Sequence, residues 1–326
     1  MGNSPTMKDV AKEAGVALGT VSKVFNGIPV GEPYRIKVEE AAQRLGYKIN
    51  SYARSLKTNK KSIIAVILPT VAHPFFGLLA EYCSRILKKR GYHMLLSTTD
   101  FNPDAEKDCI LMVQQNIVDG IICLSYSPEL EITSSIPFVS IDRYFNASVP
   151  CVSSDNFGGG QLAAQKLVEF GCKKLLFLRS ASPVIGEVDK RQLGFDSFCN
   201  ANNIQHESMI VYEPEGFQKF FTFLDSHIRN GKLEYDGIFC GTDHLAVQVV
   251  RYLRSRGIRI PEDVQLIGYD GIWNHFEEDF FCSTIVQPVE AMVQACVDIL
   301  LAEDPSNLPP LMCLPVSYGY GGTTIR

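Results

Sequence analysis

The sequence predicts an α/β protein, with an N-terminal all-α helix-turn-helix head followed by two doubly wound α/β lobes. Residues 7–26 carry two short helical patterns that are interrupted at Gly15. From residue 62 onward, short apolar runs alternate with longer amphipathic stretches, and this alternation occurs twice, before about residue 155 and after residue 173. A chain of 326 residues also suits a small head and a two-lobed body better than a single domain.

The first helical pattern has clear signals at both ends. Val10, Ala11 and Ala14 fall on one apolar face. Thr6 is followed three residues later by Asp9, which is the spacing of a capping box. Gly15 suits a tight turn, where a positive φ is often required.

The second helical pattern continues the apolar face through Val16, Val21 and Val24. Its opposite face is small or polar and is available to a partner: Leu18, Gly19, Thr20, Ser22 and Lys23. This arrangement is typical of a helix-turn-helix whose second helix enters the major groove of DNA.

The charge distribution agrees with a polyanionic partner for the head. Residues 1–61 contain eleven Lys and Arg against five Asp and Glu, a net charge of +6. The whole chain carries −5, so residues 62–326 carry −11. Because basic segments bind phosphate backbones, we expect the head to bind double-stranded DNA. The alternative is a solvated basic helical tail.

The body shows the pattern of parallel sheets covered on both faces. Continuous apolar runs predict strands at 63–68, 94–98, 120–124, 138–142, 174–178, 237–240 and 264–269. Amphipathic stretches predict helices at 76–90, 105–116, 157–170 and 245–256. Gly91, Gly171 and Gly257 follow three of these stretches, as glycines at helix C-termini do.

Several classes of protein are disfavoured. No apolar run approaches the ~20 residues of a membrane helix, and the N-terminus has no apolar signal core, so we expect a cytoplasmic protein without a membrane role. The ten cysteines form no C-x-x-C pair and mostly lie in apolar runs, which predicts reduced core thiols. The six histidines are dispersed, so we expect no metal site and no cofactor.

Polar and aromatic residues follow several predicted strands, where open α/β sheets bind ligands. They include the segment 73–76, the pairs Asp142-Arg143 and Asp155-Asn156, and the positions Asp243, Asp270 and Gln287, with Arg191 beginning a later amphipathic stretch. Carboxylates, amides and guanidinium groups form paired hydrogen bonds that suit the hydroxyls of a sugar. Residues 158–160 lack the full G-x-G-x-x-G spacing, and nothing marks a nucleophile with its base, so we expect no catalytic residues.

Residues 9–26 resemble the head of the lac repressor/galactose repressor family of bacterial transcription regulators. The resemblance continues through residues 41–48, which are similar to the third helix, and residues 50–56, which are similar to the hinge helix. Three positions depart from the usual pattern: Ala17 and Gly31 stand where Ser is usual, and Tyr34 where Thr is usual. Lys23 also replaces an Arg, whose planar fork suits guanine better.

The resemblance implies a ligand-responsive repressor with contacts to operator DNA and to a small-molecule effector. The implied DNA-binding residues are Thr6, Leu18, Gly19, Thr20, Ser22, Lys23, Asn26, Asn50, Arg54 and Leu56, with Leu56 as an apolar wedge in the minor groove. The implied effector contacts are Phe75, Phe76, Asp142, Arg143, Asn156, Arg191, Asp243 and Asp270. The effector is expected in a cleft between lobes that resemble periplasmic sugar-binding proteins. A carbohydrate is the expected class, with purines as the alternative that also occurs in this family. The chain is expected to cross between the lobes at 156–161, 286–290 and 318–321.

Each effector contact also has a structural interpretation. Phe75 and Phe76 suit the core, Asp243 and Asp270 suit helix N-caps, and Arg191 suits an ion pair. Asp155 suits a cap as well, which would leave Asn156 as the binding residue. Trp273, the only tryptophan, suits either a sugar face or packing between the lobes.

These observations together predict three parts: a DNA-binding head at 1–49, a hinge helix and linker at 50–61, and an effector-binding and dimerisation body at 62–326. A two-fold operator calls for a homodimer, expected to form through residues 76–90 and the strand after Gly91. Two alternatives are a sugar-binding protein without a DNA role and an enzyme that uses the same cleft. The absent signal segment and the basic head disfavour the first.

Overall fold

The computed structural model describes residues 5–25, 27–47, 62–115, 117–127, 130, 132, 137–146, 148–182, 184–212, 216–274, 279–302, 304 and 308–325. The chain divides into two compact units, a head within residues 1–61 and a body within residues 62–326. The predicted hinge residues Asn50, Arg54 and Leu56, and also Asn26, lie outside the described residues.

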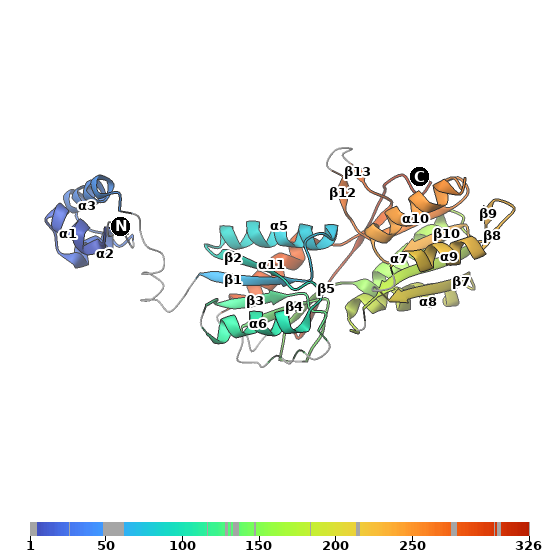
Figure 1. Ribbon diagram of the computed structural model, residues 1–326, viewed down its shortest axis with the longest axis horizontal. Coiled ribbons are helices and arrows are strands. Elements are labelled where there is room, and N and C mark those ends of the chain that lie inside the picture. Colours follow the sequence, from blue (N-terminus) through green and yellow to red (C-terminus); the bar gives the residue numbers. More distant parts are fainter. Residues whose placement is uncertain are drawn as a thin grey trace. The chain divides into compact units, whose positions relative to one another are not determined.

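The described part of the head consists of three helices: α1 Met7–Ala14, α2 Leu18–Phe25 and α3 Glu32–Leu45 (Figure 1). Their apolar faces form one small core of Val10, Ala11, Ala14, Val21, Val38, Ala41 and Ala42. The capping box is confirmed, because the Asp9 amide donates to the Thr6 hydroxyl and the Asp9 carboxylate accepts from the Thr6 amide. Gly15 has φ of 63°, the left-handed turn conformation expected between the first two helices.

The first half of the body forms what we call lobe 1, a six-stranded parallel sheet in the order β15-β5-β4-β3-β1-β2. Its strands are β1 Ile63–Leu68, β2 His93–Thr98, β3 Gly120–Cys123, β4 Phe138–Ile141, β5 Cys151–Ser154 and β15 Leu311–Leu314. The helices α5 Pro74–Lys89 and α11 Val289–Leu300 pack on one face, and α6 Pro103–Gln114 packs on the other (Figure 1).

The second half, lobe 2, repeats this plan with the sheet order β16-β14-β11-β10-β6-β7. Its strands are β6 Lys174–Ala181, β7 Gln205–Tyr212, β10 Gly237–Cys240, β11 Gln265–Asp270, β14 Thr284–Val286 and β16 Ser317–Gly319, and only β16 runs antiparallel to its neighbour. One face carries α7 Asn156–Glu169 and α8 Lys190–Ala201, and the other carries α9 Gln218–Ser226 and α10 Asp243–Ser255. Short elements complete the lobe: η1 Glu187–Asp189, β8 Ile228–Arg229, β9 Lys232–Leu233, β12 Trp273–Asn274 and β13 Asp279–Phe280.

Of the three predicted crossings between the lobes, the one at 286–290 is confirmed, and the one predicted near 156–161 lies one residue earlier. The chain leaves β5 for α7 at Asp155, and it leaves β14 for α11 through Gln287 and Pro288. The third crossing was predicted at 318–321, which is wrong, because β15 ends at residue 314 and β16 begins at residue 317. Gly321 looked like part of a linker, but a Cβ there would overlap the backbone of Cys282, so this glycine permits close packing inside lobe 2.

The thiols of the body match the prediction of a reduced core. All ten cysteines are free, and nine of them are buried, with Cys313 exposed on the edge strand β15. Among the described residues, no group of three or more His, Cys, Asp or Glu side chains is placed to hold a metal ion. No helix in the described segments is long and apolar enough to cross a membrane.

Candidate functional sites in the head and between the lobes

The exposed face of α2 is the candidate DNA surface. Leu18, Gly19 and Lys23 are exposed on it, Thr20 and Ser22 are half-buried, and Val21 is buried against the head core. A Cβ at Gly19 would meet no atom within 4 Å, so this position leaves the helix backbone open to close approach. Thr6 caps α1 through its hydroxyl. The helix therefore presents the predicted side chains while its buried face anchors it to the head.

The cations of the head differ in how they are engaged. Arg35 pairs with Glu32 and Glu39, and Arg44 pairs with Glu13 and Glu40, all on the surface. Lys8, Lys12, Lys23 and Lys37 are exposed and form no ion pair within the described head. These four ammonium groups are the charges available to phosphates.

Between the lobes, Arg191 of α8 lies at the centre of a buried network that also includes α7, β11 and the loop after β10. Its Nε donates to Asn156 Oδ1 at 2.7 Å, and one terminal nitrogen donates to the Gly241 carbonyl at 2.6 Å. The same nitrogen lies 3.7 Å from Asp270 Oδ1. The guanidinium group stacks on Tyr269, with its carbon 3.6 Å from the ring centroid. Two of the predicted contacts, Asn156 and Asp270, thus meet at Arg191.

The glycines of α7 and α8 explain why this network forms. A Cβ at Gly160 would overlap the Arg191 carbonyl oxygen, and a Cβ at Gly194 would overlap the Phe157 carbonyl oxygen. The two helices therefore approach closely only because both positions are glycine. The approach brings the first turn of α8, with Arg191, next to the first turn of α7, with Asn156. The glycines at 158–160 are explained by packing, and Asp155 is confirmed as the α7 N-cap that accepts from the Gly158 amide.

Two aspartates in this region occupy unusual backbone conformations. Asp142 follows β4 with φ of 57°, and Asp270 ends β11 with φ of 127°. Asp142 accepts from the Ser153 hydroxyl at 2.7 Å, while its carbonyl accepts from the Glu187 amide of lobe 2 at 2.8 Å. Non-glycine residues with such φ values are sparsely populated and often mark functional positions.

Asp270 has an unusual environment for a carboxyl group. One oxygen accepts from Gln287 at 2.9 Å, while the other is buried and has no hydrogen-bond partner among the described residues. Burial raises the pKa of Asp270, against the opposing effect of Arg191, and burial likewise raises the pKa of Asp142. An unsatisfied buried oxygen of this kind is where a ligand hydroxyl gains most from binding.

Asp243 and Arg143 do not join this network. The Asp243 carboxylate accepts from the Ile272 amide and the Thr284 hydroxyl, both in lobe 2, and burial raises its pKa to about 7. Its interpretation as an N-cap is wrong, because Thr242 caps α10. Arg143 donates to the Ser125 hydroxyl at 3.1 Å and to the Ser127 carbonyl, which fixes a loop of lobe 1.

The aromatic residues are divided between the core and the surface. Phe75 and Phe76 are both buried in the lobe 1 core, and Phe76 also contacts the ring of His73, 4.8 Å between centroids. Trp273 is 42% exposed, with its ring edge-on to Phe280 in the β12–β13 pair. The interpretation of both phenylalanines as core residues thus agrees with the structure.

A second group of residues joins the lobes and was absent from the predicted contacts. The Ser154 hydroxyl of β5 donates to Gln287 at 2.8 Å and lies 3.2 Å from the Tyr269 hydroxyl. Gln287 carried a signal, because a polar residue directly followed a predicted strand. Tyr269 carried none, since it lies inside an apolar strand run.

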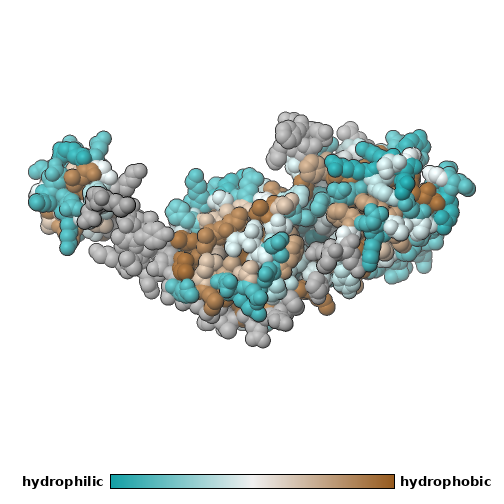
Figure 2. Space-filling model, viewed as in Figure 1, coloured by the Kyte–Doolittle hydropathy of each residue, from teal (hydrophilic) through white to brown (hydrophobic). Residues whose placement is uncertain are grey.

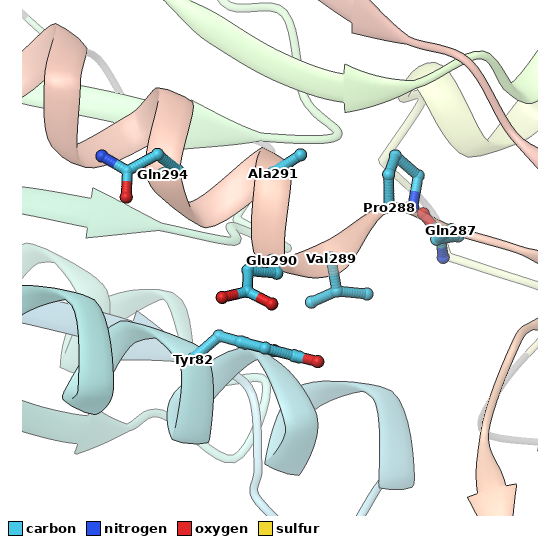
Figure 3. A pocket seen from close by; sticks show the side chains of 7 residues that line it. All are labelled: Tyr82, Gln287, Pro288, Val289, Glu290, Ala291 and Gln294. Carbon is cyan, nitrogen blue, oxygen red and sulfur yellow. The ribbon is translucent and has the colours of Figure 1, made fainter.

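A hollow of about 540 Å³ lies beside the second crossing. Figure 3 shows Tyr82 of α5 facing Val289 and Glu290 at the start of α11. The other lining residues are Gln287, Pro288, Ala291 and Gln294. Of these, Gln287 is the link to the Arg191 network, through Asp270.

Comparison with known proteins agrees with both parts of the chain. Residues 6–50 match the family described as bacterial regulatory proteins, lacI family, and residues 164–318 match a periplasmic binding protein-like domain. The sucrose operon repressor of Streptococcus mutans is 35% identical over 318 residues, which cover 95% of this chain and 96% of that protein.

Two solved structures are also similar. A periplasmic binding protein/LacI transcriptional regulator from Alkaliphilus metalliredigens, complexed with D-xylulofuranose, is 28% identical with a TM-score of 0.67, covering 81% of this chain and 100% of that one. The lac repressor dimer bound to operator and an anti-inducer is 21% identical with a TM-score of 0.81 over 99% of this chain and 100% of that one, which shows the fold. Because the Streptococcus mutans relative is similar along almost the whole length of both chains, the protein belongs to the lacI family of bacterial regulatory proteins.

Proposed function

We propose that this protein is a transcription repressor whose head binds operator DNA and whose body responds to a carbohydrate bound between the lobes. The observation that carries the proposal is the buried Asp270 oxygen without a partner among the described residues, held beside Arg191 at the carboxyl end of β11. In the same chain, a basic helical head exposes Leu18, Gly19 and Lys23 on one helix. A ligand site and a DNA surface in one polypeptide are what a ligand-controlled regulator requires.

The DNA surface divides into positioning and reading residues. Lys23 and the half-buried Thr20 and Ser22 lie on α2 so that they reach phosphates and base edges when the helix enters the major groove. Leu18 and Gly19 supply apolar and close backbone contact. Thr6, as the N-cap of α1, lies at the helix N-terminus that faces the DNA phosphates in this proposal. Asn26, Asn50, Arg54 and Leu56 remain proposed DNA contacts from the sequence alone.

The three predicted parts remain our proposal for the domain organisation: a head at 1–49, a hinge and linker at 50–61 and the body at 62–326. The chain forms two compact units that meet between residues 61 and 62, which supports the boundary between the linker and the body. In this scheme Leu56 wedges into the minor groove and couples the body to the head.

The effector contacts that we propose are Asp270 and Arg191, with Asn156 and Asp142 as the residues that orient them. Arg191 offers guanidinium N–H groups in a plane fixed by Tyr269, and Asp270 offers an acceptor, so a pair of neighbouring hydroxyls is bound by donor and acceptor together. The names of the similar proteins, with sucrose in one and D-xylulofuranose in another, support a carbohydrate. Phe75, Phe76, Arg143 and Asp243 support the site from within their lobes.

We propose binding without catalysis, and action in the cytoplasm, where a bacterial operator is found. The polar groups between the lobes hydrogen-bond one another, and no serine or cysteine among them is paired with a histidine base in the described residues. The Streptococcus mutans relative, which is 35% identical over 95% of this chain, is named as a repressor, which supports the same conclusion.

We also propose a homodimer formed through lobe 1. The strand β2 is at the edge of its sheet, and it exposes Leu95 and Leu96. Figure 2 shows apolar surface gathered on this part of lobe 1. An apolar edge strand calls for a covering partner, and a two-fold operator calls for two heads.

The experiment that tests the proposed function is a thermal-shift screen of the full chain against sucrose, D-xylulose, ribose and fructose. A sugar at 100 times its Kd should add about 2.7 kcal/mol to the free energy of unfolding. Assaying the same mixtures for sugar breakdown separates a regulator from an enzyme. Stabilisation by a sugar together with no affinity for any DNA sequence would favour the sugar-binding protein without a DNA role.

A further inference from the structure

Two histidines from opposite lobes are in direct contact. His73 is the residue that precedes α5 in lobe 1, and His244 is the second residue of α10 in lobe 2. Their ring centroids are 5.3 Å apart, with the rings nearly perpendicular at 78°. Each ring also packs on an aromatic ring of its own lobe, His73 on Phe76 and His244 on Phe217. The contact therefore joins two aromatic clusters across the boundary between the lobes.

The surroundings of His73 suit a neutral imidazole. Its Nδ1 is buried, and no hydrogen-bond partner for it is present among the described residues. In a neutral imidazole, one ring nitrogen is an acceptor and can remain without a hydrogen-bond partner. In a protonated imidazole, both nitrogens are donors, and each needs an acceptor. In the described part of the body, neither His73 nor His244 forms an ion pair with a carboxylate.

The charged groups that face this contact are unfavourable to an added proton. Arg191 of α8 and His244 of α10 both lower the pKa of His73, because a positive charge on either group repels a proton on His73. No carboxyl of the described residues is among the groups that shift the pKa of His73. Asp142 accepts from Ser153, Asp243 accepts from Ile272 and Thr284, and Asp270 accepts from Gln287 through one of its two oxygens. A proton on either ring would therefore meet positive charge and desolvation without a compensating anion.

We infer that the His73–His244 contact is a pH-sensitive latch between the lobes, which holds while both imidazoles are neutral and separates when His73 is protonated. When the lobes part, both rings gain water and lose the repulsion of Arg191 and of each other. The latch needs no sugar, so it goes beyond the proposed function and stands or falls separately from it.

The size of the effect follows from the difference between the two states. Burial, His244 and Arg191 lower the pKa of His73 to about 4 while the lobes are in contact, and burial also lowers the pKa of His244. In water an imidazole has an ordinary pKa of about 6.5. The open state therefore binds protons more tightly between pH 4 and 6.5, and acid favours opening. Acidification from about pH 7.5 to 5.5 should weaken the closed state about tenfold through His73 alone.

The aspartates beside the latch respond in the opposite direction. Burial raises the pKa of Asp142 and of Asp270 in the closed arrangement, so their protonation favours closure. An opening that increases with acid is therefore assigned to the histidines and not to these carboxyls.

Hydrogen exchange of one backbone amide reports directly on lobe contact. The Glu187 amide of lobe 2 donates to the Asp142 carbonyl of lobe 1 at 2.8 Å, and this bond is lost when the lobes part. The Leu124 amide donates to the Ile67 carbonyl within lobe 1 and serves as the internal reference. Both are measured on the full chain without sugar at pH 7.5 and 5.5, after correction for the intrinsic exchange rate at each pH.

The expected result is that protection of the Glu187 amide falls at the lower pH, by at most about tenfold because the two carboxyls act in the opposite direction, while protection of the Leu124 amide stays constant. His73→Gln should remove this fall, and His244→Gln should reduce it. His93→Gln, an exposed position on β2, is the matched control and should keep the full response.

Three results would overturn the latch: constant Glu187 protection in the wild-type protein, an unchanged fall in His73→Gln, or a fall of full size in His244→Gln. The first would show that protonation does not separate the lobes. The second would assign the response to another group, and the third would exclude the contact between the two rings as its origin.

Discussion

The guanidinium carbon of Arg191 lies 3.6 Å from the centroid of the Tyr269 ring, and its Nε donates to Asn156 at 2.7 Å. Stacking fixes the plane of the guanidinium group, and the hydrogen bond fixes its rotation within that plane. The position of the side chain is therefore set before any ligand arrives, which reduces the entropy lost on binding. The same geometry orients Arg191 toward Asp270.

The first prediction concerns this arrangement. Arg191→Lys should lower the free energy of unfolding by about 1–3 kcal/mol, because an ammonium group neither stacks flat nor replaces the bonds to Asn156 and Gly241. It should also abolish any thermal shift produced by a sugar. Urea denaturation and the sugar screen measure the two effects.

The matched control is Arg256→Lys. Arg256 also stacks on a tyrosine, Tyr252, and pairs with Asp225, but it does so on the surface. This variant should leave both stability and sugar response close to those of the wild-type protein. A sugar response that survives in Arg191→Lys would remove Arg191 from the proposed site.

A second prediction follows from the buried carboxyl of Asp243, whose pKa is raised to about 7 by burial. The folded state holds this proton more tightly than the unfolded chain, whose carboxyl has an ordinary pKa near 3.8. The resulting stabilisation is complete below the unfolded pKa and is lost as the pH rises through 7. The destabilisation caused by Asp243→Asn should therefore be larger at about pH 5 than at about pH 8.

Asp263→Asn is the control for this measurement. Arg259 lowers the pKa of the exposed Asp263 to about 2, so this group contributes no change in stability between pH 5 and 8. Its variant should show the same difference from wild type at both pH values in urea denaturation. An equal effect of Asp243→Asn at the two pH values would show that Asp243 is ionised throughout.

A third prediction concerns the start of α2, where Ala17 accepts the first helical hydrogen bond through its carbonyl and has no side-chain oxygen to cap the helix. Ala17→Ser should stabilise the head by about 1 kcal/mol, because the new hydroxyl reaches the Thr20 amide. Circular dichroism of the full chain should show the first unfolding transition at higher temperature. A lower transition temperature would show that a side-chain hydroxyl at position 17 does not stabilise α2.

The dimer gives a fourth prediction. Leu96→Lys places a charge on the exposed edge strand β2 and should raise the dimer dissociation constant at least about tenfold. Ile185→Lys, at a position of lobe 2 that is 86% exposed, should leave the dimer intact. Light scattering over a dilution series compares the two variants. Equal masses for both at all concentrations would place the dimer contact elsewhere.

Much of the fold could be predicted from the sequence, because strand and helix periodicity are local. The strands at residues 63–68 and 237–240 have the predicted bounds, and the repeat of the plan in two lobes is confirmed. The third crossing was misplaced at 318–321 because glycines in a sequence are compatible both with a flexible linker and with close packing. Only the neighbouring Cys282 backbone distinguishes them.

The site was less predictable, because its composition depends on tertiary contacts. Asp243 and Asp270 look alike in sequence, since each follows a buried strand, yet Asp243 is saturated by Ile272 and Thr284 whereas Asp270 keeps a buried oxygen without a described partner. Tyr269 looked like any core strand residue. Arg191 could be predicted, since a lone arginine opens an amphipathic stretch at the carboxyl edge of the sheet.

The most direct test of the account is selection of DNA by the full chain from a library of random duplexes, followed by anisotropy measurements on the enriched sequence. We predict a pseudo-palindrome with two half-sites, and an affinity that falls at least about 10³-fold between 50 and 200 mM salt. Lys23→Ala should reduce the salt dependence by about one ion and relax preference at one base pair of each half-site. Enrichment of no sequence, or an affinity that is unchanged between these salt concentrations, would contradict the account.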